Sequence, residues 1–375
     1  MNILYDGQVF SFQDYGGISR YYFEIIRHLL PLKDVAPNLL VRYSNNIFLK
    51  NLPIQDIRPL FPSRRIKGKF ELLKFLNRRF VQKNFLRYGT PDIFHPTYYD
   101  PYFLRFIGDI PFVVTVYDMV HELYPDQFHP IDYSAKNKRI VTSRANRIIA
   151  ISENTKKDLV RLFHLSPEKI DVIPLAAGLS PDFQQKPSLQ FPENYFLYVG
   201  KRNTYKNFNV LLNAMRGMKE TISTCYLICA GGGALSASER QQIQTLGLDG
   251  SIMQMEVSDS QLAYLYSHAK ALVYPSQYEG FGIPILEAFV CGCPAIASNS
   301  SSLPEVGGSA ALYFHPSDVS TLTAILSEVW TKQGLADDLR ARGRERARLF
   351  SWEQTARKTL DTYDKIIHEG ITKFE

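Results

Sequence analysis

The second half of the chain alternates short apolar segments with longer amphipathic ones, and this alternation constrains the fold more than any other feature. The apolar segments have the length and composition of buried strands. They lie at Tyr195–Val199, Cys225–Ala230, Ile252–Met255, Ala271–Tyr274 and Ala295–Ala297. Helices are predicted to begin near Asn207, Ser236, Ser258 and Pro284. Strands that alternate with helices form a doubly wound parallel sheet, so an α/β domain is predicted here.

The first half shows the same alternation in a less regular form. Strands are predicted at Asn2–Tyr5, Ala36–Tyr43, Ile93–Phe94, Phe112–Val116 and Arg147–Ile151. Helices are predicted at Ser19–Leu30 and Ser134–Ala145. A second α/β domain is therefore expected in this half.

A segment rich in proline, glutamine and serine, Gly178–Asn194, has the composition of a linker between the halves. A chain of 375 residues also exceeds what one hydrophobic core ordinarily supports. We therefore expect one domain over 1–185, a second over 186–350, and a terminal helix over 351–375. This helix is a candidate for crossing back to the first domain. Two doubly wound domains that face each other leave a cleft at the carboxyl ends of their strands, where ligands bind.

The composition indicates a cytoplasmic protein. No apolar run reaches the roughly 18 residues that a membrane span needs, and the N-terminal segment lacks the basic and apolar parts of a signal peptide. Pairing residues two apart strains disulfide geometry, no second Cys or His cluster completes a zinc site, and the cytoplasm keeps thiols reduced, so we expect buried, reduced thiols and no metal. They are Cys225, Cys229, Cys291 and Cys293.

The net charge of +6 is concentrated in one stretch, Arg64–Arg87, where basic residues alternate with aromatic and aliphatic ones at roughly helical spacing. A basic amphipathic helix suits the surface of an anionic membrane, which suggests peripheral contact with the inner face of the cytoplasmic membrane. The alternative is the solvated face of a helix that packs into its own domain. Nucleic acid is not an expected partner, because no recognised binding module accompanies the basic residues.

One segment carries more chemical information than the rest, and it runs from Ser276 to Glu287. Its two glycines permit a tight loop after a strand, and Pro284 suits the first turn of a helix. Backbone amides at such a helix start favour a phosphate or the polar edge of a sugar. The amides in question belong to Phe281, Gly282 and Ile283. The carboxylates of Glu279 and Glu287 can accept hydrogen bonds from sugar hydroxyls.

This arrangement resembles the E-x7-E signature of the retaining glycosyltransferases of family 4, which have the two-domain GT-B fold. The resemblance extends from Gly16-Gly17 to the region of Ser351 and Trp352, most of the chain. It implies that Glu279 contacts the transferred sugar and that Glu287 contacts the ribose of the nucleotide. It also implies a nucleotide sugar as the donor.

Lys201, Arg202 and Lys206 follow the first strand of the second domain. A departing diphosphate is stabilised by cations aimed at the charge that develops in the transition state. The family resemblance implies a basic pair in this loop, for which Lys206 is the clear match and Arg202 is preferred over Lys201 as its partner.

Three positions in the first domain match the family less closely. The adjacent glycines Gly16 and Gly17 permit a close backbone approach to the donor phosphates, and Arg20 follows them. The family usually has a histidine followed by an aspartate where this chain has Tyr117 and Asp118. His121 is a candidate replacement for that histidine, and packing is its alternative role.

Two further residues follow predicted strands of the first domain. His95 lies beyond Ile93–Phe94, and a single histidine is more often structural than catalytic. Ser152 follows Arg147–Ile151 and resembles a serine-rich turn of the family, which suggests that it lines the cleft.

The expected reaction is a metal-independent and cofactor-independent hexosyl transfer with retention of configuration. The donor favoured by the resemblance is GDP-mannose, with UDP- and dTDP-sugars left open. The acceptor is a saccharide or a lipid-linked saccharide of cell-surface polysaccharide. A glycoside hydrolase that uses Glu279 and Glu287, a dinucleotide oxidoreductase and a non-catalytic sugar- or nucleotide-binding module are the alternatives.

Overall fold

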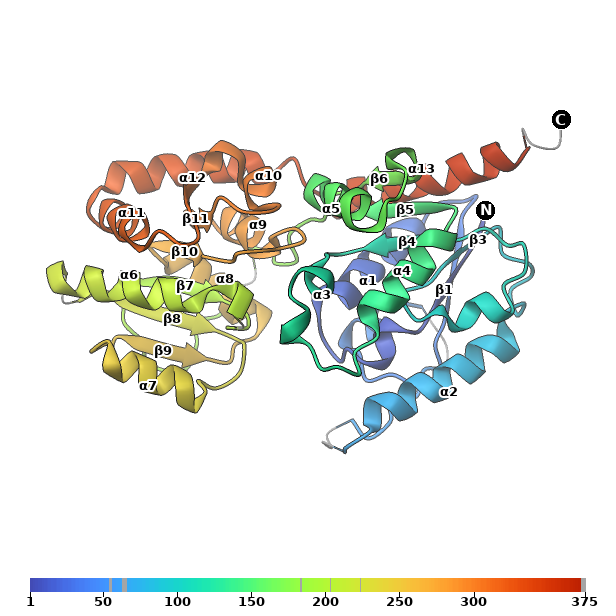
Figure 1. The fold of residues 1–375 in the computed structure, drawn as a ribbon, viewed down its shortest axis with the longest axis horizontal. Helices are drawn as coiled ribbons and strands as arrows, with labels where there is room; N and C mark the ends of the chain where they lie inside the picture. The colour runs from blue at the N-terminus through green and yellow to red at the C-terminus, as the bar shows by residue number, and fades with distance from the viewer. Residues whose placement is uncertain (54–55, 63–65, 183, 203, 223, 372–375) are drawn as a thin grey trace. The chain divides into compact units, whose positions relative to one another are not determined.

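Separate parallel sheets divide the chain into two units, each with its own core (Figure 1). A computed structural model describes the chain apart from residues 54–55, 63–65, 183, 203, 223 and 372–375. The first unit comprises Met1–Leu175 and the chain from Trp352 onward, and the second comprises Ala176–Ser351. The sequence boundary expected near residue 185 lies within the second unit.

The second unit contains a six-stranded parallel sheet with the order β12-β11-β10-β7-β8-β9. Its strands are β7 (Tyr195–Val199), β8 (Tyr226–Ala230), β9 (Ile252–Met255), β10 (Ala271–Tyr274), β11 (Ala295–Ser298) and β12 (Ala311–Phe314). All five neighbouring pairs are parallel, as the alternation of strands and helices predicted. The last strand, β12, is an addition to the predicted set.

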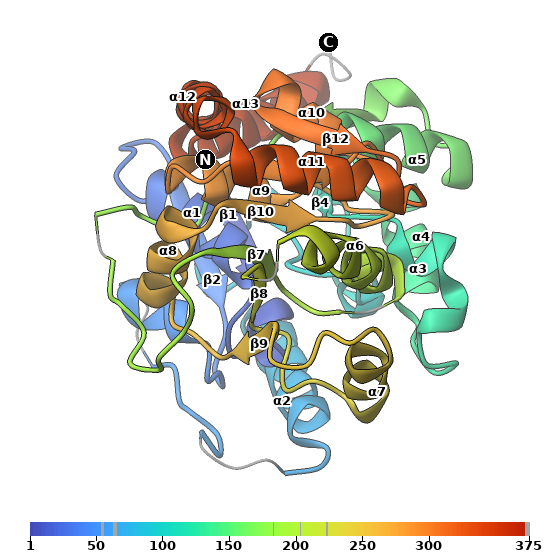
Figure 2. The ribbon, with the colours of Figure 1, turned by 90° about the vertical axis from the view of Figure 1, so that its left-hand side faces the viewer.

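Alternate side chains of β7 point to opposite faces of this sheet, and each face is covered by helices. Phe196 and Tyr198 belong to the hydrophobic cluster formed with α6 (Phe208–Thr221), α7 (Ala237–Thr245) and α11 (Val319–Thr331). The neighbouring Tyr195 donates a hydrogen bond of 2.8 Å to the carbonyl oxygen of Leu265 in α8 (Asp259–His268). Figure 2 shows α6 and α8 on opposite sides of β7.

Local sequence signals set the starts of several helices in this unit. α7 and α8 begin with capping boxes in which Ser236 pairs with Glu239 and Ser258 pairs with Gln261. The remaining elements are α9 (Ile283–Val290), α10 (Leu303–Gly307), α12 (Gln333–Ala347) and the short 3₁₀ turns η6 (Thr204–Lys206) and η7 (Gly308–Ala310).

The cysteines are buried and free, as the sequence predicted. Burial raises the pKa of each thiol to about 12, so all four stay protonated.

The first unit contains two three-stranded parallel sheets with the orders β2-β1-β3 and β4-β5-β6. They meet where the amide of Phe94 donates to the carbonyl oxygen of Pro111 at 3.0 Å and Phe94 pairs with Phe112. The strands are β1 (Asn2–Asp6), β2 (Ala36–Leu40), β3 (Ile93–His95), β4 (Val113–Val116), β5 (Arg147–Ala150) and β6 (Ile170–Val172). Two units with parallel sheets and alternating helices agree with the two α/β domains predicted from the sequence.

Six helices of this unit are described, together with five short 3₁₀ turns. The helices are α1 (Gly17–Leu29), α2 (Lys69–Asn84), α3 (Val120–Leu123), α4 (Ser134–Arg144), α5 (Glu153–Phe163) and α13 (Trp352–Ile371). The 3₁₀ turns are η1 (Val9–Ser11), η2 (Ile47–Asn51), η3 (Pro101–Arg105), η4 (Pro125–Gln127) and η5 (Pro167–Lys169). In the described part of the chain, no helix combines the length and apolar character needed to cross a bilayer.

The final helix, α13, packs against α1 within the first unit. Its Tyr363 is fully buried and lies 3.0 Å from the hydroxyl of Tyr5 and 2.6 Å from Nδ1 of His95. A helix far away in sequence therefore completes the core around the first strand.

Candidate functional site

The carboxyl ends of β7 and β10 form the topological switch point of the second unit. β7 comes first in the chain, its neighbours are β8 on one side and β10 on the other, and all three run parallel. Loops that leave such a point diverge and leave room for a ligand. The loop after β7 carries Arg202 and Lys206, and the loop after β10 carries Glu279. These three predicted residues therefore lie at one edge of the sheet.

Lys206 and Glu279 form an ion pair at this edge. The ammonium nitrogen lies 2.6 Å from Oε1 and 2.8 Å from Oε2 of Glu279, so it contacts both carboxylate oxygens. The side chains are 17% and 11% exposed, which keeps the pair accessible to a ligand while limiting its contact with water. The ammonium also lies over the rings of Tyr205 and Tyr274, at 5.1 and 5.8 Å from their centroids.

Asn207 fixes the backbone beside Lys206. It adopts a left-handed conformation with φ of 58° and is buried. Its side-chain amide donates to the carbonyl oxygens of Pro275 at 3.1 Å and Pro316 at 2.6 Å. These bonds tie the loop after β7 to the loops after β10 and β12, and the bond to Pro275 helps hold Lys206 near Glu279 in addition to their charges.

Ser301 and Ser302, in the loop after β11, support the segment around Glu279. The hydroxyl of Ser301 accepts a hydrogen bond of 2.9 Å from the amide of Glu279. The hydroxyl of Ser302 donates to the carbonyl oxygens of Glu279 and Phe281 at 2.9 and 2.8 Å. Sequence reasoning assigned these serines no individual role, although a run of serines directly after a predicted strand was a visible signal.

Gly282 allows the tight entry into α9. Its φ is 109°, and a Cβ at this position would lie 2.8 Å from Cδ2 of Leu303. A side chain is therefore excluded on both conformational and steric grounds. Helix α9 starts at Ile283. Pro284 has no N–H, and the amide of Ile285 donates to the carbonyl oxygen of Gly282 at 2.9 Å, so the helix start presents partial positive charge mainly through the amide of Ile283.

Glu287 lies in α9 and is 9% exposed. The hydroxyl of Tyr266 in α8 donates to its Oε2 at 3.3 Å. Burial, reinforced by the charge of Glu287, raises the pKa of Tyr266 well above its usual value, which keeps the tyrosine a hydrogen-bond donor. Glu287 is thereby held in one orientation from the neighbouring helix.

Arg202 is held by a glycine-rich loop. Its Nε donates to Glu239 at 2.7 Å, and its terminal nitrogens donate to the carbonyl oxygens of Gly231 at 3.2 Å and Gly233 at 2.7 Å. The side chain is 3% exposed, so it lies beneath the loop rather than reaching outward. Lys201, by contrast, is exposed. Direct contact between Arg202 and a diphosphate, which stays a prediction, requires the guanidinium to leave part of this network.

In the first unit, Gly16 precedes α1 in an extended conformation and Gly17 is its first residue. A Cβ on Gly16 would lie 2.6 Å from Oε1 of Gln13, so a side chain there would displace the Gln13 amide, whose oxygen accepts a hydrogen bond of 3.1 Å from the amide of Ser19. Arg20 is mostly buried, with a hydrogen bond of 2.8 Å to the hydroxyl of Tyr15. The expected contact of these glycines with donor phosphates stays a prediction.

Tyr117 and Asp118 follow β4 but have different surroundings. Tyr117 is buried among tyrosines, with ring centroids 5.8 Å from Tyr21 and 6.3 Å from Tyr99. Asp118 has a side chain that is 36% exposed, and its carbonyl oxygen accepts a bond of 2.8 Å from the buried Lys138. Of the two, Asp118 is the residue that a substrate can reach.

His121 stacks on Phe128 at 3.9 Å, and its Nε2 lies 3.4 Å from Oδ2 of Asp132. Burial and the nearby charge of Lys138 lower the pKa of this imidazole, which keeps it neutral at physiological pH. Among the residues that the structure describes, its buried Nδ1 has no hydrogen-bond partner. A neutral imidazole is a competent base, so a catalytic role for His121 stays a prediction.

His95 and Ser152 have structural roles. His95 is fully buried, and its Nε2 lies 3.0 Å from the hydroxyl of Thr115. Burial lowers its pKa to about 3, so it is neutral throughout the physiological range. The fully buried Ser152 caps α5 by accepting a bond of 3.0 Å from the amide of Thr155.

Comparison with known proteins identifies the family. Residues 180–346 match the family described as Glycosyl transferases group 1, and residues 15–177 match Glycosyltransferase Family 4. The O-antigen chain mannosyltransferase B of Escherichia coli is 30% identical over 375 residues, covering 92% of this chain and 95% of that protein.

Two solved structures share the fold at lower identity. The sucrose-phosphate synthase of Thermosynechococcus elongatus superposes with a TM-score of 0.76 at 20% identity, covering 98% of this chain and 99% of that one. The Anabaena HepE protein, solved in complex with UDP and glucose, has a TM-score of 0.70 at 20% identity, covering 97% and 99%.

These matches confirm the family and the enzyme class predicted from the sequence, and they set aside the hydrolase, oxidoreductase and non-catalytic alternatives. They extend over both units and include a relative aligned along nearly its whole length. The chain belongs to glycosyltransferase family 4 and is a hexosyltransferase of the GT-B fold.

Proposed function

We propose that this enzyme transfers mannose from GDP-mannose, with retention of configuration and without a metal ion, to a saccharide acceptor of a cell-surface polysaccharide. The observation that carries the proposal is the ion pair of Lys206 and Glu279 at the switch point, beside the start of α9. It presents a cation for a diphosphate and a carboxylate for sugar hydroxyls at one sheet edge.

The proposed chemistry needs no protein nucleophile. The bond between the sugar C1 and the diphosphate oxygen breaks, and a new bond from C1 to the acceptor oxygen forms on the same face. The acceptor proton passes to an oxygen of the departing phosphate. Lys206 and the positive end of the α9 dipole stabilise the charge on the diphosphate, while Glu279 orients the sugar and Glu287 the ribose. Asp118 and His121 are the candidate catalytic residues of the first unit, and they are assigned to the acceptor hydroxyl.

The choice of mannose rests on relatives. The Escherichia coli protein is named an O-antigen chain mannosyltransferase, and a Salmonella typhimurium relative with the same description is 30% identical over 217 residues. That alignment covers 58% of this chain and 60% of the relative. A saccharide of the O-antigen type is the acceptor that these names support, and its attachment to a lipid carrier is part of the proposal.

Helix α2 supports contact with a membrane that carries such an acceptor. It buries Leu73 and Val81 within its own unit. One face of the helix therefore packs into the domain, as the alternative interpretation of the basic stretch expected. Its other side chains include Phe70, Leu72 and Phe75, which are 40%, 42% and 52% exposed. Exposed bases accompany them at Lys67, Arg79, Lys83 and Arg87. The first bases of this stretch, Arg64 and Arg65, lie outside the described residues.

A thermal-shift panel tests the donor assignment. GDP-mannose and GDP should raise the melting temperature more than the UDP or dTDP counterparts, because a ligand that binds only the folded state stabilises it. Release of GDP should then depend on a saccharide acceptor and persist in the presence of EDTA. A chain that no nucleoside diphosphate stabilises would contradict the donor-binding role of the second unit.

Kinetics of Lys206→Ala test the role of the ion pair. We expect kcat to fall about 10²–10³-fold with a smaller change in the Kd for GDP, because the charge matters most in the transition state. Lys332→Ala is the matched control, since Lys332 forms a 2.8 Å ion pair with Glu328 that is exposed on both sides. Equal kinetics for the two variants would refute the assignment.

A further inference from the structure

Lys138, in α4, is a charged side chain without contact with water, because it is 0% exposed. Burial of a charge is costly unless the group is paired and hydrogen-bonded. Even a well-formed buried ion pair is often no more stabilising than apolar side chains of similar size. Packing and stability alone therefore give little reason for a lysine at this position, and the donor site in the second unit gives it no role.

The ammonium of Lys138 contacts the chain on both sides of His121. Its Nζ donates a hydrogen bond of 2.8 Å to the carbonyl oxygen of Asp118 and another of 2.8 Å to Oε2 of Glu122. It also lies 4.0 Å from Oδ1 of Asp118, and that oxygen accepts a bond of 3.0 Å from the amide of Val120. One side chain from α4 therefore anchors the start of α3 and the turn that precedes it.

Tyr99, in the loop after β3, extends this anchoring to the residue before Asp118. Its buried ring lies under the Lys138 ammonium, whose Nζ is 5.4 Å from the ring centroid. Its hydroxyl accepts a bond of 3.1 Å from the amide of Tyr117. A cation over an aromatic ring is attracted more strongly where water is excluded. The segment 117–122 is thus fixed at three points around a single buried charge.

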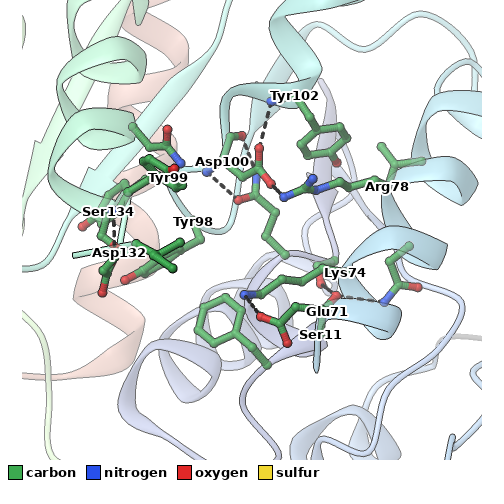
Figure 3. Close-up of a pocket in the computed structure, with 18 of the residues that line it drawn as sticks. Ser11, Glu71, Lys74, Arg78, Tyr98, Tyr99, Asp100, Tyr102, Asp132 and Ser134 are labelled. Carbon is green, nitrogen blue, oxygen red and sulfur yellow. Dashed lines mark hydrogen bonds and ion pairs between the residues drawn. The ribbon is translucent and has the colours of Figure 1, made fainter. Parts of the chain in front are cut away.

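Asp132 joins His121 to the same helix. It lies two residues before α4, and its Oδ1 accepts a bond of 2.8 Å from the amide of Ser134, the first residue of that helix (Figure 3). Its Oδ2 lies 3.4 Å from Nε2 of His121. The first turns of α4 therefore hold the imidazole through Asp132 and the backbone around it through Lys138.

The segment also contains buried polar atoms that these contacts leave unpaired. Among the described residues, Nδ1 of His121 and Oε1 of Glu122 have no hydrogen-bond partner. Such atoms in a protein interior call for an explanation, and a catalytic role is a recognised one. Burial and the positive charge of Lys138 lower the pKa of His121, whereas three nearby carboxylates raise it. They belong to Asp118, Asp132 and Glu122. The balance keeps the ring neutral, and only a neutral imidazole has a lone pair that accepts a hydrogen bond.

We propose that Lys138 is a positioning residue, which holds Asp118 and His121 in the arrangement that receives the acceptor hydroxyl. It acts through these two residues and touches no substrate, because its side chain is fully buried. Preorganisation of this kind depends on neighbours that lock the catalytic side chains in one orientation. The proposal rests on the transferase function proposed above, and it adds a residue from α4 to which the sequence pattern assigned no role.

Kinetics of Lys138→Met test the positioning role, with GDP-mannose as the donor and the uncharged probe α-mannotriose as the acceptor. We expect kcat to fall about 10–100-fold, because small displacements of catalytic groups slow a reaction to this extent. The Kd for GDP should stay within about twofold of the wild type, since the donor site lies in the second unit.

Lys169→Met is the matched control. The Nζ of Lys169 donates to the carbonyl oxygens of Thr142 at 3.3 Å and Ser143 at 3.0 Å, at the opposite end of α4. This variant removes an equal charge beside the same helix and keeps the contacts of the segment 117–122. Its kcat should remain within about twofold of the wild type.

A titration of His121 adds a measurement that does not depend on turnover. NMR of the full chain follows the imidazole signal, which the variant His121→Asn identifies. Lys138→Met should raise the pKa of His121, because the three carboxylates then act without the opposing cation. The acid limb of kcat should move to higher pH in the same variant, whereas Lys169→Met should change neither property.

A double variant covers the case in which Lys138→Met leaves Glu122 unpaired and fails to fold. Lys138→Met with Glu122→Gln removes both charges and should melt close to the wild type. It should still show the loss of kcat. The pKa of His121 should still rise in it, because Lys138 acts on the imidazole more strongly than Glu122 does.

The outcomes separate this role from the proposed function. Wild-type kcat in a folded Lys138 variant, or a pKa of His121 that stays unchanged or falls, overturns the positioning role. A loss of kcat with an equal loss of GDP affinity overturns it as well, because it indicates damage to the whole chain. Absence of transfer by the wild-type protein contradicts the proposed donor or acceptor instead, and the titration of His121 then decides the role of Lys138.

Discussion

At the scale of single residues, the glycine-rich loop after β8 in the second unit is intolerant of a side chain at Gly232. Gly231, Gly232 and Gly233 all have positive φ, from 72° to 78°. A Cβ on Gly232 would lie 2.3 Å from the backbone oxygen of Gly200. The loop in turn binds Arg202, so its shape and the position of that guanidinium depend on each other.

Gly232→Ala should therefore destabilise the second unit by about 2–4 kcal/mol, through backbone strain and steric overlap together. Gly334→Ala is the matched control. Gly334 lies in α12 with open space around its Cα, so alanine should stabilise the protein by up to about 1 kcal/mol. Urea unfolding of the wild type and the two variants measures both changes in the free energy of unfolding. A lower stability of both variants would contradict the steric explanation.

The buried imidazole of His95 predicts a pH dependence. Its pKa is about 3 in the folded chain and about 6.5 when exposed, so the unfolded state binds more protons between these values. The free energy of unfolding should fall by up to about 1.4 kcal/mol per pH unit as the pH drops below 6.5. His95→Asn should reduce this slope, as measured by urea unfolding from pH 7.5 to 5.5.

His315→Asn provides the control, because His315 is exposed. This variant should retain the acid slope of the wild type. An unchanged slope in His95→Asn would show that other groups dominate the acid sensitivity of the first unit.

Residues that are close in sequence were easier to assign than residues joined by tertiary contacts. Glu279, Gly282 and Glu287 lie in one segment whose spacing identified the family. The burial of Arg202 depends on hydrogen bonds to backbone carbonyl oxygens that lie beyond residue 230. No local sequence pattern specifies where these carbonyl groups point. The core position of Tyr117 likewise depends on tyrosines from α1 and from the loop after β3.

At the scale of elements, α2 combines packing with an exposed apolar and basic surface, and this surface predicts a binding experiment. The double variant Arg79→Glu with Lys83→Glu should bind phosphatidylglycerol vesicles at least about tenfold more weakly than the wild type, since each base near an anionic surface contributes about 1 kcal/mol. Added salt should weaken wild-type binding in the same assay.

Arg216→Glu with Arg348→Glu changes the net charge equally at exposed sites of the second unit, with side chains 58% and 74% exposed. Its vesicle binding should stay close to that of the wild type. If the two double variants lost vesicle binding equally, the binding would be an effect of net charge in general and not of the surface of α2.

Strong apolar segments predicted the strands of the second unit, whereas short or interrupted elements were missed. β6 spans only Ile170–Val172, and its central Asp171 breaks the apolar pattern. In the folded chain that carboxylate pairs with Arg147 at 2.9 Å and with Lys365 of α13 at 2.8 Å. The strand depends on a helix almost two hundred positions away, which no local window detects.

At the scale of the whole molecule, the two units differ in continuity. The second unit is one segment, Ala176–Ser351, and the first consists of two. A fragment over 176–351 should therefore fold alone and bind GDP with nearly the affinity of the full chain. A fragment over 1–175 lacks Tyr363 and the other buried side chains of α13, a loss of at least about 3–5 kcal/mol by analogy with large core deletions.

Circular dichroism and thermal melting of the fragments check this expectation. Addition of a peptide that spans α13 should restore a cooperative transition to the fragment over 1–175. A cooperative transition without the peptide would show that α13 is dispensable for the first core.

The return of α13 to the first unit has a consequence for synthesis on the ribosome. Chains emerge from the N-terminus, and domains ordinarily fold in that order. Here the helix that completes the first core is translated after the whole of the second unit. The second unit can reach its native state while the first is still incomplete, so the nascent chain exposes the apolar surface around Tyr5 and His95 until α13 emerges. Premature stop codons that remove α13 should thus leave the first unit without a complete core.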